Sequence, residues 1–451
     1  MPDYYTRAEA KRLTERIIAL SKAEGCLVTL TSGVDGNTRF AANEISTGGD
    51  ATDAVVTVAS RYGKRSAAVT TNVFTDEALR RAVETSEQLA KLTPENPEQM
   101  PLLAPQSYAT VPAFFDATHA LDAAARTRAV QEAAERCAAA GMVGTGFIQR
   151  LAGATAVANS AGLFAYQRST VASYTLTVRT PEGTGSGWAG TAHNDWRRTT
   201  PATALAERAI RKATGSRDAM ALEPGRYTVV LEPMAVGNLL GLLAFALNAR
   251  PADEGRSFFS KPGGGNKIGE KVVDERVTIL SDPLDPDLLG SPFTGEGLPI
   301  GRTVWIENGV VRHLAYDRFW ADKKGVQPVP FGGGLKMLGG SESFDELLAR
   351  VERGLLVTRF WYIRSVDPRT ILYTGLTRDG LFLIENGRVT GPVRNFRFNE
   401  SPIALLNNLV AVGRPERVAA GESGGAEGAG SVVVPPIVSR EFTFTSVSEA
   451  V

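Results

Sequence analysis

The chain has 451 residues, of which 43% are hydrophobic and 22% are charged. This is the composition of an ordinary globular protein, and the length predicts two domains, because single cores stop growing at roughly 250–300 residues. Basic and acidic residues number 49 each, so no broad basic field is available to bind a nucleic acid. The two cysteines, Cys26 and Cys137, have no metal-binding or redox spacing.

The apolar segments of the chain are too short to predict a membrane protein. The first 25 residues follow an amphipathic helix pattern without the long apolar run of a signal peptide. The longest apolar run, within Leu239–Leu247, covers about half of a membrane span. We therefore expect a cytoplasmic protein that binds neither membranes nor nucleic acids.

The N-terminal half alternates helices with strand pairs. Apolar residues recur at helical spacing in Ala8–Ala23, and Thr75 caps a second helix that ends before Pro94. Short apolar runs between turn residues predict strands, two of them joined at Gly63. In chain order we predict a helix at Ala8–Ala23, strands at Cys26–Thr31, Asn37–Ala42, 54–63 and 64–72, helices at 75–92 and Leu121–Ala140, strands at Val143–Ala158 and Leu163–Arg179, and a helix near Pro201–Thr214.

Short strands separated by Gly and Pro turns follow from Tyr227 onward. The segment Leu231–Ala249 is the main exception, since it has the pattern of a strand end, a short turn and an apolar helix. The motif Ile-Glu-Asn-Gly occurs in both 305–319 and 383–398. Asn-Gly between apolar runs predicts a type I′ hairpin, because both residues tolerate positive φ. We expect two similar hairpins in one β-rich domain.

These patterns together predict an α+β fold. A mixed helix and antiparallel-sheet domain over residues 1–220 precedes a β-rich domain over 221–451, which contains one prominent apolar helix. The Gly-rich segment 413–431 is expected to be a flexible loop, and a last strand pair follows in 431–446.

Three motifs resemble known sites without meeting their requirements. Gly421–Gly425 fits G-x-S-x-G but lacks the strand and helix that hold a nucleophilic serine. The glycine-rich run Lys261–Lys271 lacks the Gly-Lys-Ser/Thr ending of a phosphate-binding loop. Asp282, Asp285 and Asp287 do not have EF-hand spacing and are better explained as turn-forming residues. The arginine- and aromatic-rich stretches 359–364 and 395–398 are expected to be strands.

Only three histidines occur, His119, His193 and His313. They lie far apart in the sequence, so no helix presents a histidine pair to a metal ion. Away from a cleft, each is expected to have a structural role. The residues alone therefore show no complete catalytic arrangement.

Several segments resemble the TldD/PmbA (TldD/TldE) family of metallopeptidase subunits. The resemblance is carried by Gly375–Gly413, Ala78–Leu103, Val351–Phe360 and the closing stretch 431–451. It implies one of two subunit types. TldD-type chains carry a zinc-binding helix of pattern H-E-x-x-x-H and a distant cysteine ligand, in which the glutamate takes the proton of the attacking water. TldE-type (PmbA-type) chains lack this helix motif and pair with a TldD-type chain.

The present sequence departs from the zinc motif at every key position. With Ala-Val-Gly at 235–237 as the anchor, the resemblance places Pro233 and Asn238 at the two histidine positions and Met234 at the glutamate position. Proline has no ligand atom, methionine is not a base, and a neutral amide is a weak zinc donor. Neither cysteine lies in the C-terminal domain. The sequence therefore predicts no catalytic residues and no zinc in this chain, and the resemblance places zinc in a TldD-like partner.

The resemblance implies a non-catalytic subunit of a zinc metallopeptidase complex that acts on unfolded or extended peptides. The stretch that we place near the peptide is Phe331, Gly332, Gly333, Gly334 and Leu335, since glycines permit close backbone approach. One alternative is a homodimeric peptide-binding or scaffold protein without proteolysis. Another is an independent hydrolase, for which His313, beside Arg312 and Asp317, is the nearest candidate.

Overall fold

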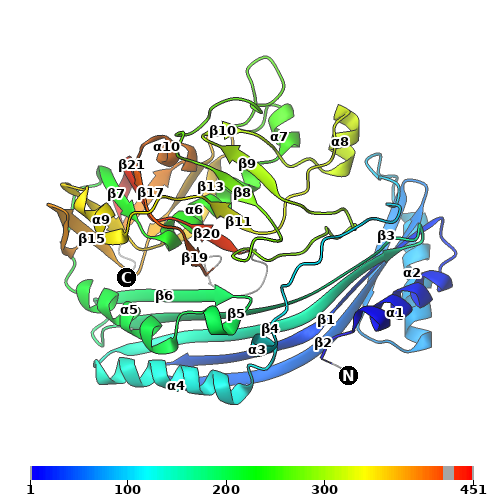
Figure 1. Cartoon of the computed structure of the whole chain (residues 1–451), viewed down its shortest axis with the longest axis horizontal. Helices are drawn as coiled ribbons and strands as arrows, with labels where there is room; N and C mark the ends of the chain where they lie inside the picture. The colour runs from blue at the N-terminus through cyan, green and yellow to red at the C-terminus, as the bar shows by residue number, and fades with distance from the viewer. Residues whose placement is uncertain (1–2, 420–430, 449–451) are drawn as a thin grey trace.

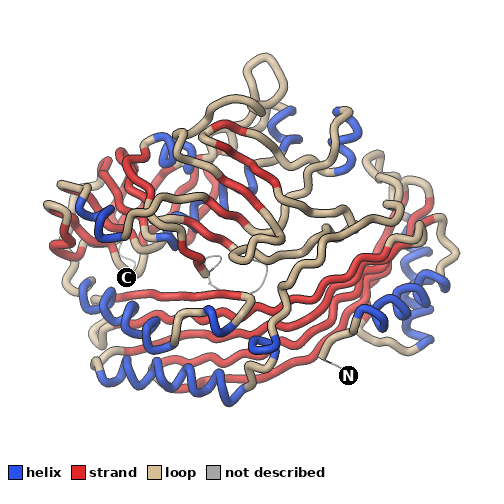
Figure 2. The backbone as a smooth tube through the Cα atoms, viewed as in Figure 1, coloured by secondary structure: helices blue, strands red, loops and turns tan. Residues whose placement is uncertain are grey.

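The computed structural model describes residues 3–419 and 431–448 and confirms the predicted α+β class. Its strands form three sheets, one in the N-terminal half and two in the C-terminal half. The C-terminal half lies against the concave face of the long, curved N-terminal sheet (Figures 1 and 2). Within the described residues, no helix is both long enough and apolar enough to cross a membrane.

The N-terminal sheet is a six-stranded antiparallel sheet in the order β3-β2-β1-β4-β5-β6. Helices cover only its convex face (Figure 1), and two separate apolar clusters anchor α1 and α2 at one end and α4 and α5 at the other. The elements are α1 (Arg7–Leu20), β1 (Gly25–Ala41), β2 (Glu44–Tyr62), β3 (Arg65–Thr71), α2 (Asp76–Leu92), α3 (Asp116–His119), α4 (Ala123–Ala139), β4 (Val143–Asn159), β5 (Phe164–Arg179), β6 (Ser186–His193), a short 3₁₀ helix (Trp196–Arg198) and α5 (Ala202–Gly215).

One prediction in this half is wrong: the strands expected at Cys26–Thr31 and Asn37–Ala42 are parts of the single strand β1. The intervening Ser-Gly-Val-Asp-Gly has the composition of a turn. It stays extended because β1 pairs along most of its length with both β2 and β4. A Cβ at Gly33 would lie 2.8 Å from the carbonyl oxygen of Ala152, so this glycine permits the close approach of β4.

The C-terminal half contains a nine-stranded mixed sheet and a smaller six-stranded sheet. Its elements are β7 (Gly225–Leu231), α6 (Pro233–Ala246), α7 (Ala249–Asp253), β8 (Ile279–Ser281), β9 (Thr303–Glu307), β10 (Val310–Val311), α8 (Arg318–Lys324), β11 (Leu335–Met337), α9 (Phe344–Ala349), β12 (Arg353–Val357), β13 (Phe360–Asp367), β14 (Leu372–Thr377), β15 (Leu381–Glu385), β16 (Arg388–Pro392), β17 (Phe396–Glu400), α10 (Pro402–Asn407), β18 (Leu409–Val412), β19 (Glu416–Val418), β20 (Val432–Val434) and β21 (Ile437–Val447). The two arginine-rich stretches form β13, at the edge of the larger sheet, and β17.

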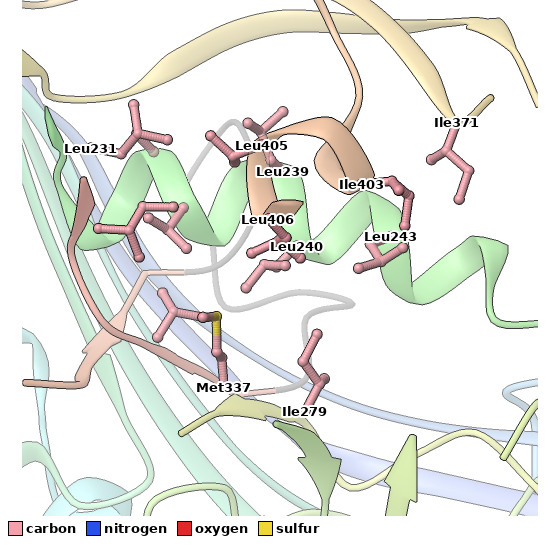
Figure 3. Close-up of a cluster of buried hydrophobic side chains, with 14 of the residues drawn as sticks. Leu231, Leu239, Leu240, Leu243, Ile279, Met337, Ile371, Ile403, Leu405 and Leu406 are labelled. Atoms are coloured by element: carbon pink, nitrogen blue, oxygen red, sulfur yellow. The ribbon is translucent and has the colours of Figure 1, made fainter. Parts of the chain in front are cut away.

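Helix α6 is the apolar helix that the sequence predicts, and it belongs to the main core. Leu239, Leu240 and Leu243 are almost fully buried in a cluster that contains side chains from both C-terminal sheets. Leucine and isoleucine side chains from α10 lie beside it, and Met337 of β11 and Ile279 of β8 approach from the smaller sheet (Figure 3). Burying a leucine contributes about 2 kcal/mol, so packing alone accounts for the apolar character of this helix.

Both Asn-Gly hairpins form as predicted, with positive φ at both turn residues, Asn308-Gly309 and Asn386-Gly387. They belong to different sheets: the first joins β9 to β10, and the second joins β15 to β16. The predicted last strand pair is also divided between the sheets. Strand β20 pairs with β11 and β19, whereas β21 pairs with β7, β17 and β18. Residues 420–430 of the expected flexible loop lie outside the described residues.

Candidate functional site

The first two turns of α6 carry the three positions that the resemblance aligns with a zinc motif. Pro233 is the first residue of the helix, where its fixed φ suits a helix start and its missing N–H costs no hydrogen bond. Met234 is 6% exposed and belongs to the core cluster. The Asn238 side-chain oxygen accepts a hydrogen bond from the backbone N–H of Phe360 at 3.1 Å, which ties α6 to the start of β13. Each residue therefore has a structural role.

These residues do not fit a zinc ion. Pro233 offers no donor atom, Met234 offers only a buried thioether, and the oxygen of Asn238 already accepts a hydrogen bond. Across residues 3–419 and 431–448, three or more His, Cys, Asp or Glu side chains nowhere gather closely enough to bind a metal ion. The two cysteines are buried in the N-terminal half, far in sequence from α6, and burial raises the pKa of each thiol to about 11.

The glycine stretch predicted to lie near peptide leads into β11. Phe331 is 41% exposed and stacks on Trp305, with ring centroids 5.0 Å apart. Gly333 and Gly334 have φ values of +78° and +81°, a left-handed conformation that strongly favours glycine. The Leu335 N–H donates to the Ser431 carbonyl at 2.8 Å and joins β11 to β20.

Side-chain hydrogen bonds also hold this stretch in place. The Trp305 indole N–H donates to the Ser281 hydroxyl at 2.8 Å, and that hydroxyl donates to the Gly334 carbonyl at 2.6 Å. A Cβ at Gly290 would lie 2.9 Å from the Cα of Gly333, so a second glycine is needed where the two backbones meet. The conformation is thus fixed from several sides before any ligand binds.

A cavity of about 420 Å³ lies between the two halves of the chain, beside these glycines. The N-terminal sheet contributes the side of β4 and β5 that the helices leave uncovered, including Gln167 and Ser169. The C-terminal half contributes Gly333, Gly334 and Arg417. Phe331, Gly332 and Leu335 are not among the lining residues, so the structure brings two of the five predicted residues to the cavity. A concave site at a domain interface, with a few converging polar groups, is typical of ligand-binding sites.

One residue of β19 contacts both the cavity and α6. Val418 lines the cavity, and its Cγ2 would lie 2.9 Å from a Cβ placed on Gly237, in the second turn of α6. Val418 therefore lies between Gly237 and the cavity.

Arg417 is the main charged residue of the cavity, and the sequence analysis did not identify it. Its guanidinium donates to the Asp287 carbonyl at 2.9 Å, to the Asn194 side-chain oxygen at 3.0 Å and to the Ser431 hydroxyl at 2.6 Å. Burial lowers the pKa of Arg417 to about 10, which leaves it charged at neutral pH. No local motif marks this residue, because its partners come from three distant segments of the chain.

The three histidines are in separate environments. His119 contacts Asp3 at 2.9 Å, and Nδ1 of exposed His313 lies 2.8 Å from the Val304 carbonyl. His193 is 5% exposed, and its Nδ1 accepts from the Asp195 N–H at 2.8 Å. Burial, reinforced by nearby arginines, lowers the pKa of His193 to about 4.

The hydrolase alternative centred on His313 receives no geometric support. The Asp317 carboxylate caps α8 by accepting from the Trp320 N–H at 2.7 Å, and Arg312 pairs with Glu307. A catalytic base and its orienting carboxylate must be within hydrogen-bond reach of each other, and the described contacts of His313 and Asp317 go elsewhere.

The remaining sequence motifs have structural roles or lie outside the described residues. Asp282 and Asp285 each accept a backbone N–H two residues on, which are the predicted turns. The ammonium group of Lys336 lies 2.9 Å from Asp285 and 3.1 Å from Asp287 and occupies the space between these carboxylates. The pattern at 421–425 lies outside the described residues.

Comparison with known proteins supplies the family. Models of the PmbA/TldA metallopeptidase central and C-terminal domains match residues 109–217 and 224–446. A protein of Methanothermobacter thermautotrophicus named Metalloprotease is 27% identical over 220 residues, or 44% of this chain and 45% of that protein. The Metalloprotease TldD homolog of Haemophilus influenzae is 27% identical over 226 residues, which are 47% of this chain and 45% of that protein. The matches thus span less than half the length of these relatives.

Solved structures share the fold over nearly the whole chain. TldE from Thermococcus kodakarensis has a TM-score of 0.82 at 19% identity, covering 96% of this chain and 100% of that one. A Thermotoga maritima protein also has a TM-score of 0.82, at 17% identity, with the same coverage. The family models account for most of the sequence, and the resemblance inferred from the residues is confirmed: the chain belongs to the PmbA/TldD metallopeptidase family.

Proposed function

We propose that this chain is the non-catalytic, TldE/PmbA-like subunit of a TldD/TldE-type zinc metallopeptidase complex. The observation that carries the proposal is the start of α6, where Pro233, Met234 and Asn238 stand at the three motif positions of its first two turns. Met234 is buried in the core and Asn238 is engaged by the backbone of β13. The turn contributes to packing and offers neither metal ligands nor a base.

The proposed role of the chain is to help enclose and hold an extended peptide while a TldD-like partner supplies zinc. The interdomain cavity supports this role, because it combines backbone glycines with polar side chains on a rigid frame. The similarity in fold to a protein named TldE also favours it. Zinc in the partner would polarise the peptide carbonyl and activate the attacking water. In this chain, Gly333 and Gly334 would allow a peptide backbone to approach closely.

The test compares the chain alone, a TldD-like partner alone and the co-expressed pair. Zinc content and cleavage of an unstructured peptide are measured for each. We expect the lone chain to be metal-free and inactive, with stoichiometric zinc and full cleavage only in the pair. Stoichiometric zinc or cleavage in the lone chain would overturn the proposal, as would failure of the two chains to associate.

A matched pair of variants identifies which subunit carries out the chemistry. Replacing the glutamate of the partner's H-E-x-x-x-H helix by glutamine should abolish cleavage while the complex stays intact. Met234→Leu in this chain preserves a buried apolar side chain and should leave cleavage by the pair unchanged. Loss of cleavage in Met234→Leu, with assembly and zinc content preserved, would show that this turn takes part in the reaction.

A further inference from the structure

The guanidinium of Arg417 is the feature of the cavity that packing and family membership leave unexplained. It lines the cavity and makes three hydrogen bonds, all to uncharged oxygens of Asp287, Asn194 and Ser431. A guanidinium has five N–H groups. Two of the five therefore have no acceptor within the described part of the chain, and no carboxylate there lies within ion-pair distance.

The neighbouring carboxylates are already paired with other cations. Asp285 lies 2.9 Å from the Lys336 ammonium, and Asp287 lies 3.1 Å from Lys336 and 3.5 Å from Arg198. The cluster thus contains three cations, Arg417, Arg198 and Lys336, and two anions. Removing a charge from water without a partner is costly, so this cluster favours one further negative charge.

The other charged groups that the structure describes around the cluster do not supply that charge. Asp195 makes a two-point contact with Arg197, at 3.0 and 2.8 Å. His193, which is under the influence of Arg417, Arg198, Asp195 and Asp287, is neutral at pH 7 because its pKa is lowered to about 4. Its Nδ1 accepts a hydrogen bond, so the proton of the neutral ring is on Nε2, which has no partner within the described residues. Within residues 3–419 and 431–448, the cluster therefore keeps an excess of one positive charge at neutral pH.

The size and lining of the cavity indicate which anion would be bound. A planar guanidinium with free N–H groups matches the two oxygens of a carboxylate. The cavity volume of about 420 Å³ is at the small end of the range for ligand sites, roughly 300–1,000 Å³. Ser169 adds a hydroxyl group from the N-terminal sheet, and the glycine backbone at 333–334 borders the same space. The amide N–H group of Gln167, which also lines the cavity, already donates to the carbonyls of Val111 and Arg168. The space suits the end of a peptide or one side chain.

We propose that the interdomain cavity is a carboxylate-binding subsite in which Arg417 anchors a carboxylate of the bound peptide. The inference rests on the proposed peptide-holding function and adds to it a preference for a chemical group. The carboxylate comes from the C-terminus of the peptide or from an acidic side chain. Arg417 is a binding residue here and takes no part in bond cleavage.

The test measures binding and needs neither zinc nor proteolysis. A hexapeptide whose other side chains are uncharged, labelled at its N-terminus with an electrically neutral BODIPY dye, is prepared as the free acid, as the C-terminal amide, and as the amide with one internal glutamate. Affinity for the full chain, alone and in complex with an inactivated partner, is measured by fluorescence anisotropy. A charge-assisted hydrogen bond is about twice as strong as a neutral one, and we expect the carboxylate to improve affinity about ten- to hundredfold over the amide.

Variants separate recognition from structural support. Arg417→Gln should bind the acid and the amide equally. Arg80→Gln, which removes an exposed arginine on α2, should keep the wild-type ratio of the affinity for the acid to the affinity for the amide. Arg417 also joins the two halves of the chain through Asn194, so Arg417→Gln must retain the wild-type thermal transition. If it unfolds, Arg417→Lys is used, which keeps the charge but loses the planar fork and should reduce the ratio severalfold.

The outcomes distinguish the source of the carboxylate and the two proposals. Preference for the free acid alone identifies the C-terminus, and preference for the glutamate peptide alone identifies a side chain. Equal preference for these two peptides over the plain amide shows that either carboxylate is accepted, and all three results support the subsite. Equal affinity of all three peptides for the wild type overturns it, as does a ratio that survives in Arg417→Gln. If the pair shows zinc-dependent cleavage but no preference for a carboxylate, only the carboxylate subsite is refuted. If the chain prefers a carboxylate but the pair shows no zinc-dependent cleavage, only the proposed function is refuted.

Discussion

The buried neutral His193 makes a specific prediction about stability in acid. The ring is 5% exposed, and its pKa is lowered from 6.5 to about 4, mainly by burial and then by Arg417 and Arg198. In the unfolded chain the ring takes up a proton as the pH falls through about 6.5, whereas the folded chain resists until about pH 4. The unfolded state therefore gains the proton first, and folding stability falls with decreasing pH across this window.

The magnitude follows from the two pKa values. At about 1.4 kcal/mol for each pH unit, the difference between 6.5 and about 4 corresponds to a loss of about 3 kcal/mol. This loss of folding stability is absent above about pH 7 and reaches its full value below about pH 4. This is a large fraction of a typical folding free energy of roughly 5–15 kcal/mol, so the effect should be measurable against the general acid sensitivity of the protein.

The perturbation is His193→Asn, and the assay is urea unfolding from pH 8 to 4.5. The amide oxygen of asparagine can replace Nδ1 as acceptor for the Asp195 N–H, yet the side chain does not titrate. The difference in unfolding free energy between wild type and variant should be constant above pH 7 and should shift in favour of the variant by about 2.5 kcal/mol at pH 4.5, most of the full effect. His313→Asn, at an exposed histidine, controls for loss of a histidine. Parallel pH profiles for wild type and His193→Asn would refute the reasoning.

Three further substitutions test packing, hydrogen bonding and backbone strain by the same unfolding assay. Leu240→Ala should cost about 2–5 kcal/mol, since the side chain is almost fully buried in the core around α6; a loss below 1 kcal/mol would contradict this packing. Asn238→Ala should cost about 1–3 kcal/mol because it leaves the Phe360 N–H without its acceptor, and an unchanged stability would show that this bond is dispensable. Gly387→Ala should cost more than Gly63→Ala. Both have positive φ, but only at Gly387 would the new Cβ lie 2.9 Å from a backbone atom of α9; equal losses would indicate that φ alone matters.

Elements with strong local signals could be predicted from the sequence. Thr75 caps α2 by accepting from the Ala78 N–H, Gly63 turns β2 into β3 with φ +55°, and Asn386-Gly387 forms the expected turn. In each case the determining interaction lies within a few residues of the signal. The start of α6 at Pro233 belongs to the same group, because the fixed φ of proline acts locally.

Pairing partners were less predictable, since they depend on contacts between distant segments. The glycines of β1 predict a turn locally, but continuous pairing with β2 and β4 keeps the strand extended. The closing strands β20 and β21 are consecutive in sequence and belong to different sheets. Local composition contains no information about which sheet a strand joins.

The interdomain cavity could not be predicted for the same reason. Gly333 and Gly334 carry a sequence signal because glycine is the residue that adopts their backbone conformation readily. Arg417 carries none, because its significance depends on Asn194 and Ser431, one of which lies more than 200 residues away. An arginine in the middle of a short three-residue strand has the pattern of an exposed side chain until the N-terminal half of the chain covers it.

The geometry of α6 explains why a shared fold does not establish shared chemistry in this family. The residues that bury the helix include Ala235, Val236 and Leu239, whereas the motif positions are 233, 234 and 238. The two sets interleave on the same turns and meet different demands: the first set must fill the core, and the second must present ligands. In this chain the second set also serves packing, since Met234 is buried and Asn238 accepts a hydrogen bond from the start of β13. Packing alone can therefore maintain the helix whether or not these three positions carry metal ligands, so the chemistry of a family member must be judged at those positions.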